Sequence, residues 1–261
     1  MSSDYARFRE FVRERRTVRA YRPEPIPLQL VEQAIEDACW APSPHDTQPW
    51  RFALVSSDDG RRRLAEAMGE RWREDLTADD TPEPFVEGQV KGSRVRLGKA
   101  QALVLVCLTQ RDLDRYPDAP RQQAEHDMAV QSIGSAIQNL LLSLHLNGLG
   151  AAWMCAPLFC PDVVKAELGL PADWEPQALL TVGWRVHTPP TPPRRPVDGE
   201  LLLSLLPEHV PGLIPRECSC QAAFARCLPS RFICNAAVRC GAFLPSPSTL
   251  KNDTVCVSCS D

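Results

Sequence analysis

The sequence predicts an α+β fold in which helices pack on a central mixed β-sheet. The first observation is a continuous apolar run over 101–108, which is typical of a central strand buried on both faces. The second is a long stretch over 122–147 with apolar residues at helical spacing, which predicts a helix ending at Gly148. The third is that helices alternate irregularly with few strands, which favours an α+β arrangement.

The part of the chain before the central strand is expected to be mostly helical. Apolar residues recur at helical spacing over 4–15, and a second such stretch covers 28–41, with the Pro-rich linker 22–27 between them. A short strand is expected over 51–56. A helix capped by Asp58 or Asp59 then runs to about Met68. The polar stretch 69–98 predicts helix fragments beside a pocket that selects the substrate.

The part after the central strand predicts two more strands, over 151–155 and 177–186, with a short helix over 161–168 between them. Gly169 ends that helix, as glycine commonly does. The Pro-rich stretch 188–196 reads as a linker, and 201–206 is expected to close the domain. We therefore expect one domain over 1–207, followed by a tail over 208–261.

Charge and hydropathy limit the class of protein. The net charge of −4 argues against general nucleic-acid binding, which usually shows a strongly basic domain. The sequence has no apolar run of about 18 or more residues that could span a membrane. Its first residues also lack the apolar core of a signal peptide. We expect a cytoplasmic protein that binds neither nucleic acid nor membrane.

Cysteine usage differs between the domain and the tail. The four cysteines of 1–207 stand singly in apolar surroundings and are expected to be small buried residues without a metal. The tail holds seven, and the pair Cys256 and Cys259 has the spacing of half a zinc site. The other spacings do not repeat, so we expect no metal site and a poorly ordered tail.

Two polar segments flank the second predicted helix. Arg15, Arg16 and Arg19 surround the hydroxyl of Thr17, and guanidinium groups bind phosphate bidentately. The alternative is that these charges only compensate a helix dipole. The second segment, 41–50, places polar side chains among prolines, which suits hydrogen bonding to a flat ring, or else is only a connector. Together the two segments suggest a mononucleotide with an aromatic head.

The order of motifs resembles the nitroreductase family of FMN flavoproteins. R-R-T-V-R-x-Y is followed by A-P-S-P-H-D-T-Q-P-W, and the similarity extends over about residues 5–207. Within the family, the sequence is most similar to the FMN-binding reductase domain of the bifunctional coenzyme F-420 biosynthesis protein. Further motifs that carry the resemblance are His126-Asp127, Gln138-Asn139-Leu140, 148–153, Gly183-Trp184 and Arg194-Arg195-Pro196, with 71–76 and 170–176 for the subgroup.

The resemblance implies FMN at the interface of a homodimer, with the flavin rather than a side chain carrying the chemistry. Asp46 stands where the family usually has Asn, which removes one amide donor from the ring loop. His45 and Asp75 are implied substrate contacts. The implied FMN contacts are Arg15, Arg16, Thr17, Arg19, Arg194 and Arg195 at the phosphate, Ser43, Asp46 and Gln48 at the ribityl chain or pyrimidine edge, and Met154, Cys155 and Ala156 beside the reactive nitrogen.

The resemblance also implies a reaction. The expected function is FMN-dependent reduction of dehydro-coenzyme F-420, with reduced nicotinamide or reduced deazaflavin as the electron donor. A generic NAD(P)H-dependent nitroreductase is the alternative within the enzymes. The alternative of another class is a non-catalytic flavin- or zinc-binding module governed by the Cys-rich tail.

Overall fold

The computed structural model describes residues 2–197, and it divides into the unit Met1–Pro193 and a second unit that starts at Arg194. A four-stranded sheet forms the centre of the first unit, in the order β1-β2-β4-β3. Its strands are β1 (Trp50–Val55), β2 (Ala102–Thr109), β3 (Leu149–Met154) and β4 (Trp174–Trp184). The α+β class is confirmed, but the sheet is antiparallel rather than mixed at every pairing of these strands.

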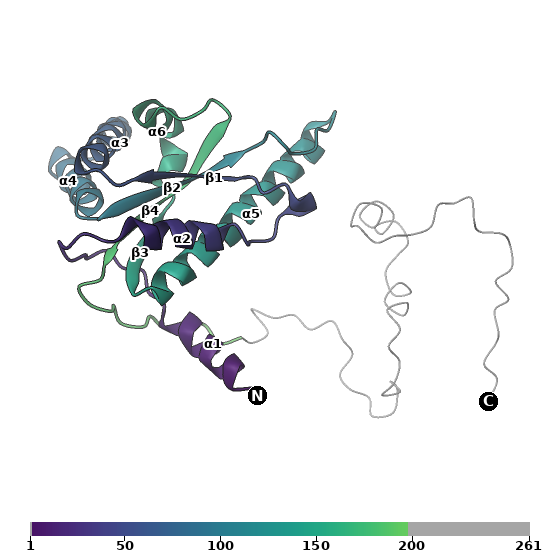
Figure 1. Ribbon diagram of the computed structural model, residues 1–261. Coiled ribbons are helices and arrows are strands. Elements are labelled where there is room, and N and C mark those ends of the chain that lie inside the picture. Colours follow the sequence, from purple (N-terminus) through teal and green to yellow (C-terminus); the bar gives the residue numbers. More distant parts are fainter. Residues whose placement is uncertain (1, 198–261) are drawn as a thin grey trace, which may run out of the picture. The chain divides into compact units, whose positions relative to one another are not determined.

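Helices cover both faces of the sheet (Figure 1). On one face, α2 (Leu28–Ala38) packs with the long α5 (Ala119–Leu146), and on the other lie α3 (Asp58–Ala78), α4 (Glu83–Gly98) and α6 (Pro161–Leu168). The N-terminal α1 (Ser3–Glu14) projects from this body and buries none of its residues. Among residues 2–197, no helix combines the length and the apolar character needed to cross a membrane.

The central strand β2 explains why there are two hydrophobic cores. All of its residues are buried, and successive side chains of a strand point to opposite faces. Burial of each such aliphatic side chain contributes about 1.5–3 kcal/mol to folding. Val104, Val106 and Leu108 therefore join the core under α2 and α5, while Leu103, Leu105 and Cys107 join the core under α3 and α6.

Two expected boundaries differ from the structure. The helix predicted to end near Met68 continues to Ala78, because its second half packs against α4, and Arg73 in that half forms an ion pair with Glu83 of α4 at 2.9 Å. Its N-cap is Ser57, whose Oγ accepts from the backbone N–H of Gly60 at 3.1 Å, rather than Asp58 or Asp59. The predicted closing segment 201–206 and the tail 208–261 lie outside the described residues.

The prediction of four buried cysteines holds for two of them. Cys107 and Cys160 are buried, and burial raises the pKa of the Cys107 thiol to about 12. Cys39 and Cys155 are exposed. Cys39 is the C-cap residue that follows the apolar face of α2, and Cys155 follows the last residue of β3, so neither lies inside an element that packs on the core.

An extended segment, residues 16–22, follows α1 and lies against β3 and the end of β4; we call it the N-terminal arm. The backbone N–H of Val18 donates to the carbonyl of Ala151 at 2.9 Å, and that of Arg22 donates to Trp184 at 2.8 Å. Thr17 and Ala151 form an isolated parallel bridge. The arm thus holds a fixed register on the sheet.

Two glycines make room for the arm. Gly150 of β3 and Gly183 of β4 are register partners. A Cβ on Gly150 would lie 2.7 Å from Val18 Cγ1, and one on Gly183 would lie 2.8 Å from the Tyr21 ring. The buried Tyr21 hydroxyl is 2.7 Å from the Thr181 hydroxyl, and burial raises the Tyr21 pKa to about 12. Close packing against paired glycines therefore positions the arm.

We expect Gly183→Ala to displace Tyr21 and to lower the free energy of unfolding by about 1–3 kcal/mol, the usual cost of overpacking. Gly88→Ala is the matched control, since nothing lies within 4 Å of a Cβ at Gly88, which is inside α4. The control is expected to leave stability unchanged or to raise it by up to about 1 kcal/mol. Urea unfolding measures both, and equal effects of the two variants would contradict the packing argument.

Candidate functional site

The arm presents polar groups to solvent at alternate positions. Val18 is buried, whereas Thr17 and Arg19 on either side of it are exposed, as expected for an extended segment with one face on the protein. Within the described part of the chain, neither Thr17 nor Arg19 has a side-chain hydrogen bond or ion pair within 4 Å. Both line a cavity of about 270 Å³ together with His187 and Pro189. These donors are open to an anion.

Unlike Thr17 and Arg19, Arg16 uses its guanidinium for hydrogen bonds within the chain. Its Nη1 donates to the carbonyls of Arg13 and Arg15, the latter at 2.8 Å, and its Nη2 donates to the hydroxyl of Thr191. Arg16 therefore ties the end of α1 to the Pro-rich segment that precedes the second unit. Its Nε is buried and has no hydrogen-bond partner among residues 2–197.

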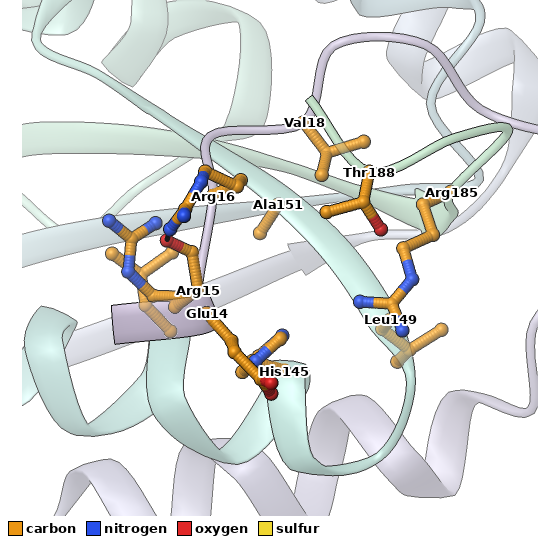
Figure 2. Close-up of a pocket in the computed structure, with 10 residues that line it drawn as sticks. Glu14, Arg15, Arg16, Val18, His145, Leu149, Ala151, Arg185 and Thr188 are labelled. Atoms are coloured by element: carbon orange, nitrogen blue, oxygen red, sulfur yellow. Dashed lines mark hydrogen bonds between the residues drawn. The ribbon is translucent and has the colours of Figure 1, made fainter. Parts of the chain in front are cut away.

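Arg15 and Arg16 share a small cavity with residues that the sequence analysis did not single out. Figure 2 shows Arg185 on the opposite side of this cavity and His145 at its base. Burial, followed by the nearby charge of Arg185, lowers the pKa of His145, which disfavours the charged imidazolium form. Arg185 directly follows β4, so its place beside the first basic cluster depends on strand pairing and leaves no local signal in the sequence.

The loop 43–48 is tightly bonded to itself. The backbone N–H of Gln48 donates to Ser43 Oγ at 3.1 Å, and the Thr47 hydroxyl donates to the carbonyl of Pro44 at 3.0 Å. His45, Asp46 and Gln48 have φ values of 54°, 54° and 47°, a left-handed region that non-glycine residues occupy at a cost of order 1 kcal/mol or more each. Such strain is concentrated at functional sites.

Asp46 has a role that the resemblance of the loop motif did not suggest. Its Oδ1 accepts from the side-chain amide of Gln48 at 3.0 Å. The carboxylate thus orients Gln48, whose carbonyl oxygen and second N–H stay available. Asp46 does remove one donor, as expected, but it positions another residue of the same loop.

A third group of predicted residues lies where β3 ends. Met154 is the last residue of β3, and the exposed Cys155 and Ala156 begin a short 3-10 helix. These three residues line a cavity of about 520 Å³ that is otherwise formed by α3 with its C-cap, α4, Phe159 and Cys160. Asp75, a predicted substrate contact, lines the same cavity. His45 is exposed and does not line it.

The structure brings two of the three groups together within one chain. The arm pairs with Ala151, and Met154 lies three residues further along β3, roughly 10 Å at about 3.3 Å per residue. The loop 43–48 instead borders a cavity of about 640 Å³ with Trp174, at the start of β4. The arm contacts Trp184, at the other end of β4, roughly 30 Å away by the same rise.

Comparison with known proteins shows to which family the chain belongs. The sequence pattern of the Nitroreductase family matches residues 12–184, well over half of the chain. The chain belongs to the nitroreductase family. This membership confirms the expected fold and the expected class of enzyme, an oxidoreductase.

Relatives within the nitroreductase family carry different names. YfhC of Bacillus subtilis (strain 168), an inferred NAD(P)H nitroreductase, is 27% identical over 192 residues, which cover 72% of this chain and 90% of YfhC. The 5,6-dimethylbenzimidazole synthase of Rhodospirillum rubrum is 31% identical over 193 residues, covering 68% and 82%. A nitroreductase-like structure from Desulfovibrio desulfuricans, solved in complex with FMN, is 25% identical with a TM-score of 0.57, covering 75% and 94%.

Some of the FMN contacts that the resemblance to the family implies stay predictions. Arg194 and Arg195 are exposed residues of the second unit, and their expected contact with a phosphate is untested. In the region that the structure describes, no group of three or more His, Cys, Asp or Glu side chains could hold a metal ion. The half zinc site at Cys256 and Cys259 lies outside that region.

Proposed function

We propose that this chain is an FMN-dependent oxidoreductase that reduces a small conjugated or nitroaromatic acceptor. The observation that carries the proposal is the spacing along β3. Anion donors stand beside Ala151, and the residues expected at the reactive nitrogen stand at Met154 and beyond, roughly 10 Å away. That separation suits the ribityl phosphate chain of a mononucleotide.

The donor groups at each end fit FMN. The Thr17 hydroxyl and the Arg19 guanidinium, both exposed, match the oxygens of a phosphate. The backbone at Cys155 and Ala156 follows a strand end and opens on a cavity with room for a substrate beside the ring. When bound, FMN supplies two-electron redox chemistry. The protein residues would bind FMN and orient it.

Arg19→Gln is expected to weaken FMN binding about 10- to 100-fold, the usual range for one charge-assisted hydrogen bond of about 1.5–3 kcal/mol. Riboflavin lacks the phosphate, so its affinity is expected to stay the same. Arg9→Gln is the matched control, because Arg9 is an exposed arginine of α1. Titration of flavin fluorescence measures each affinity, and an equal loss for FMN and riboflavin would place Arg19 away from the phosphate.

The ring loop supports a homodimer with two FMN. One mononucleotide cannot span the roughly 30 Å between the loop 43–48 and the arm of the same chain. The loop can reach a flavin only if that flavin is held by a second copy. The helix α1 also exposes an apolar stripe, with Tyr5 50%, Phe8 60% and Val12 38% exposed. Such a stripe is suited to burial in an interface.

A mixing experiment tests the shared site. A chain with a defective arm (Thr17→Val/Arg19→Gln) and a chain with a defective loop (Ser43→Ala/Gln48→Ala) are each expected to bind FMN weakly. After co-refolding, half of the dimers are mixed, and one of the two sites in each combines both intact parts. About a quarter of all sites should therefore bind FMN normally. No recovery in the mixture would show that each chain builds its own site.

Two classes of acceptor are supported. Dehydro-coenzyme F-420 is supported by the subgroup motifs, but several of their residues have structural contacts. Asp173 accepts from the Thr109 hydroxyl at 2.8 Å, and Glu175 lies 3.1 Å from His126. A nitroaromatic is supported by the similarity to YfhC. Relatives of similar identity have names for different reactions, so family membership leaves the acceptor open.

Turnover separates these proposals. The full chain is expected to oxidise reduced nicotinamide or reduced deazaflavin in the presence of dehydro-coenzyme F-420 or a nitroaromatic, and the acceptor with the higher kcat/KM identifies the reaction. A chain ending at residue 207 is expected to keep this activity, because the flavin contacts of the first unit precede that point. Loss of activity on truncation would instead favour the module governed by the Cys-rich tail.

A further inference from the structure

We propose that the cavity between α3, α4 and 154–160 selects an aromatic acceptor that carries a positive charge. This inference rests on the proposed function and names its class of substrate. The walls supply an apolar surface for a ring, because five large apolar side chains line the cavity. These residues are Met68, Trp72, Leu76, Met154 and Phe159.

Two arginines, Arg71 and Arg96, line the cavity, and the first of them is already paired. The Arg71 guanidinium donates to both carboxylate oxygens of Asp162, at 3.1 and 2.7 Å, and lies 3.4 Å from Glu74. Arg71 also holds the pKa of the Asp162 carboxyl below its usual value through this hydrogen bond. The pair joins α3 to α6, so Arg71 maintains the wall rather than offering its charge to a substrate.

Two carboxylates also line the cavity. Asp75 and Asp79 lie four residues apart at the end of α3, so they share one face of the helix. Within residues 2–197, neither side chain has a hydrogen bond or an ion pair within 4 Å. Both are exposed and stand at the rim of the cavity.

Their position costs stability, which argues for a role outside folding. The C-terminal end of a helix carries a partial negative charge, so carboxylates there are unfavourable. The last turn of α3 contains no basic residue to offset them. The helix end and the two carboxylates together give this rim a negative potential that would attract a cation and repel an anion.

The second cation of the cavity does not cancel that potential. Arg96 lies in the last turn of α4, where a basic residue compensates the negative end of its own helix. With Arg71 neutralised by Asp162, the remaining charges are Arg96 against Asp75 and Asp79, an excess of one negative charge. The faces of Trp72 and Phe159 add a second attraction for a cationic ring substituent.

A series of nitroaromatic acceptors tests the proposal on the FMN-loaded full chain. The series is 4-nitrobenzyltrimethylammonium, 4-nitrobenzyl alcohol and 4-nitrobenzoate. Each turnover takes a hydride equivalent from reduced nicotinamide and a proton from water, converts the nitro group to a nitroso group, and releases water. Because the substituents change the reactivity of each acceptor, the measured quantity is the cation-to-anion ratio of kcat/KM in each variant relative to wild type.

The double variant Asp75→Asn/Asp79→Asn is expected to lower that ratio about ten-fold, and added salt should lower it in the wild type. Glu87→Gln is the matched control, since Glu87 is an exposed carboxylate of α4 outside the cavity, and its ratio should stay within about two-fold. The double variant should also unfold at higher urea concentration, because it removes charges from the negative end of a helix.

Binding of unreactive probes gives a second readout. Benzyltrimethylammonium is expected to inhibit the wild type more strongly than benzoate, and the double variant should lose this preference. An unchanged ratio in the double variant, or an equal change in Glu87→Gln, would overturn the proposal while leaving the flavin enzyme intact. Failure to bind FMN and to reduce neutral 4-nitrobenzyl alcohol would instead refute the proposed function itself.

Discussion

The N-terminal arm stays on the sheet because β3 and β4 offer it two facing glycines. Val18 and Tyr21 pack where side chains at Gly150 and Gly183 would collide with them, and backbone hydrogen bonds to Ala151 and Trp184 fix the register. That register decides which residues of the arm face solvent. Without it, the donors Thr17 and Arg19 would have no fixed position relative to the end of β3.

The predicted FMN-binding segments lie towards opposite ends of the sheet. The arm and the segment 154–156 lie along β3 of one chain, whereas the strained loop 43–48 lies at the far end of β4. A compact ligand cannot join these regions within one protomer. The loop is strained at three positions, as functional sites often are, and within residues 2–197 it is held by its own hydrogen bonds and by the Arg51 guanidinium, which donates to the carbonyl of Gln48 at 3.0 Å. A site completed by a second copy accounts for both observations.

Much of the fold could be predicted from sequence because the signals were local. The run 101–108 is the buried strand β2, and Gly169 ends α6 with a φ of 59°. The predictions failed where the structure depends on packing between residues far apart in the sequence. The second half of α3 is helical because α4 packs against it, and the antiparallel direction of the strands depends on pairing between residues far apart in the sequence rather than on any local pattern. Cys39 and Cys155 lie just beyond apolar elements, and composition alone did not separate them from buried positions.

The candidate site also combines features that have a local sequence signal with features that depend on long-range packing. The motif residues were found by their order in the sequence, but their grouping in space was not. Arg185, His145 and the carboxylate of Asp79 enter through strand pairing and helix length, which no local pattern reports. Gly150 and Gly183 stand in recognisable motifs, yet only the pairing of β3 with β4 shows that they face the same segment.

Hydrogen exchange at the backbone amides of Val18 and Arg22 tests the central claim most directly. If the arm is held on the sheet, both amides should exchange as slowly as amides within β3 and β4, and FMN should slow them further. Exchange of these two amides at the rate of an unstructured segment, with or without FMN, would contradict the account.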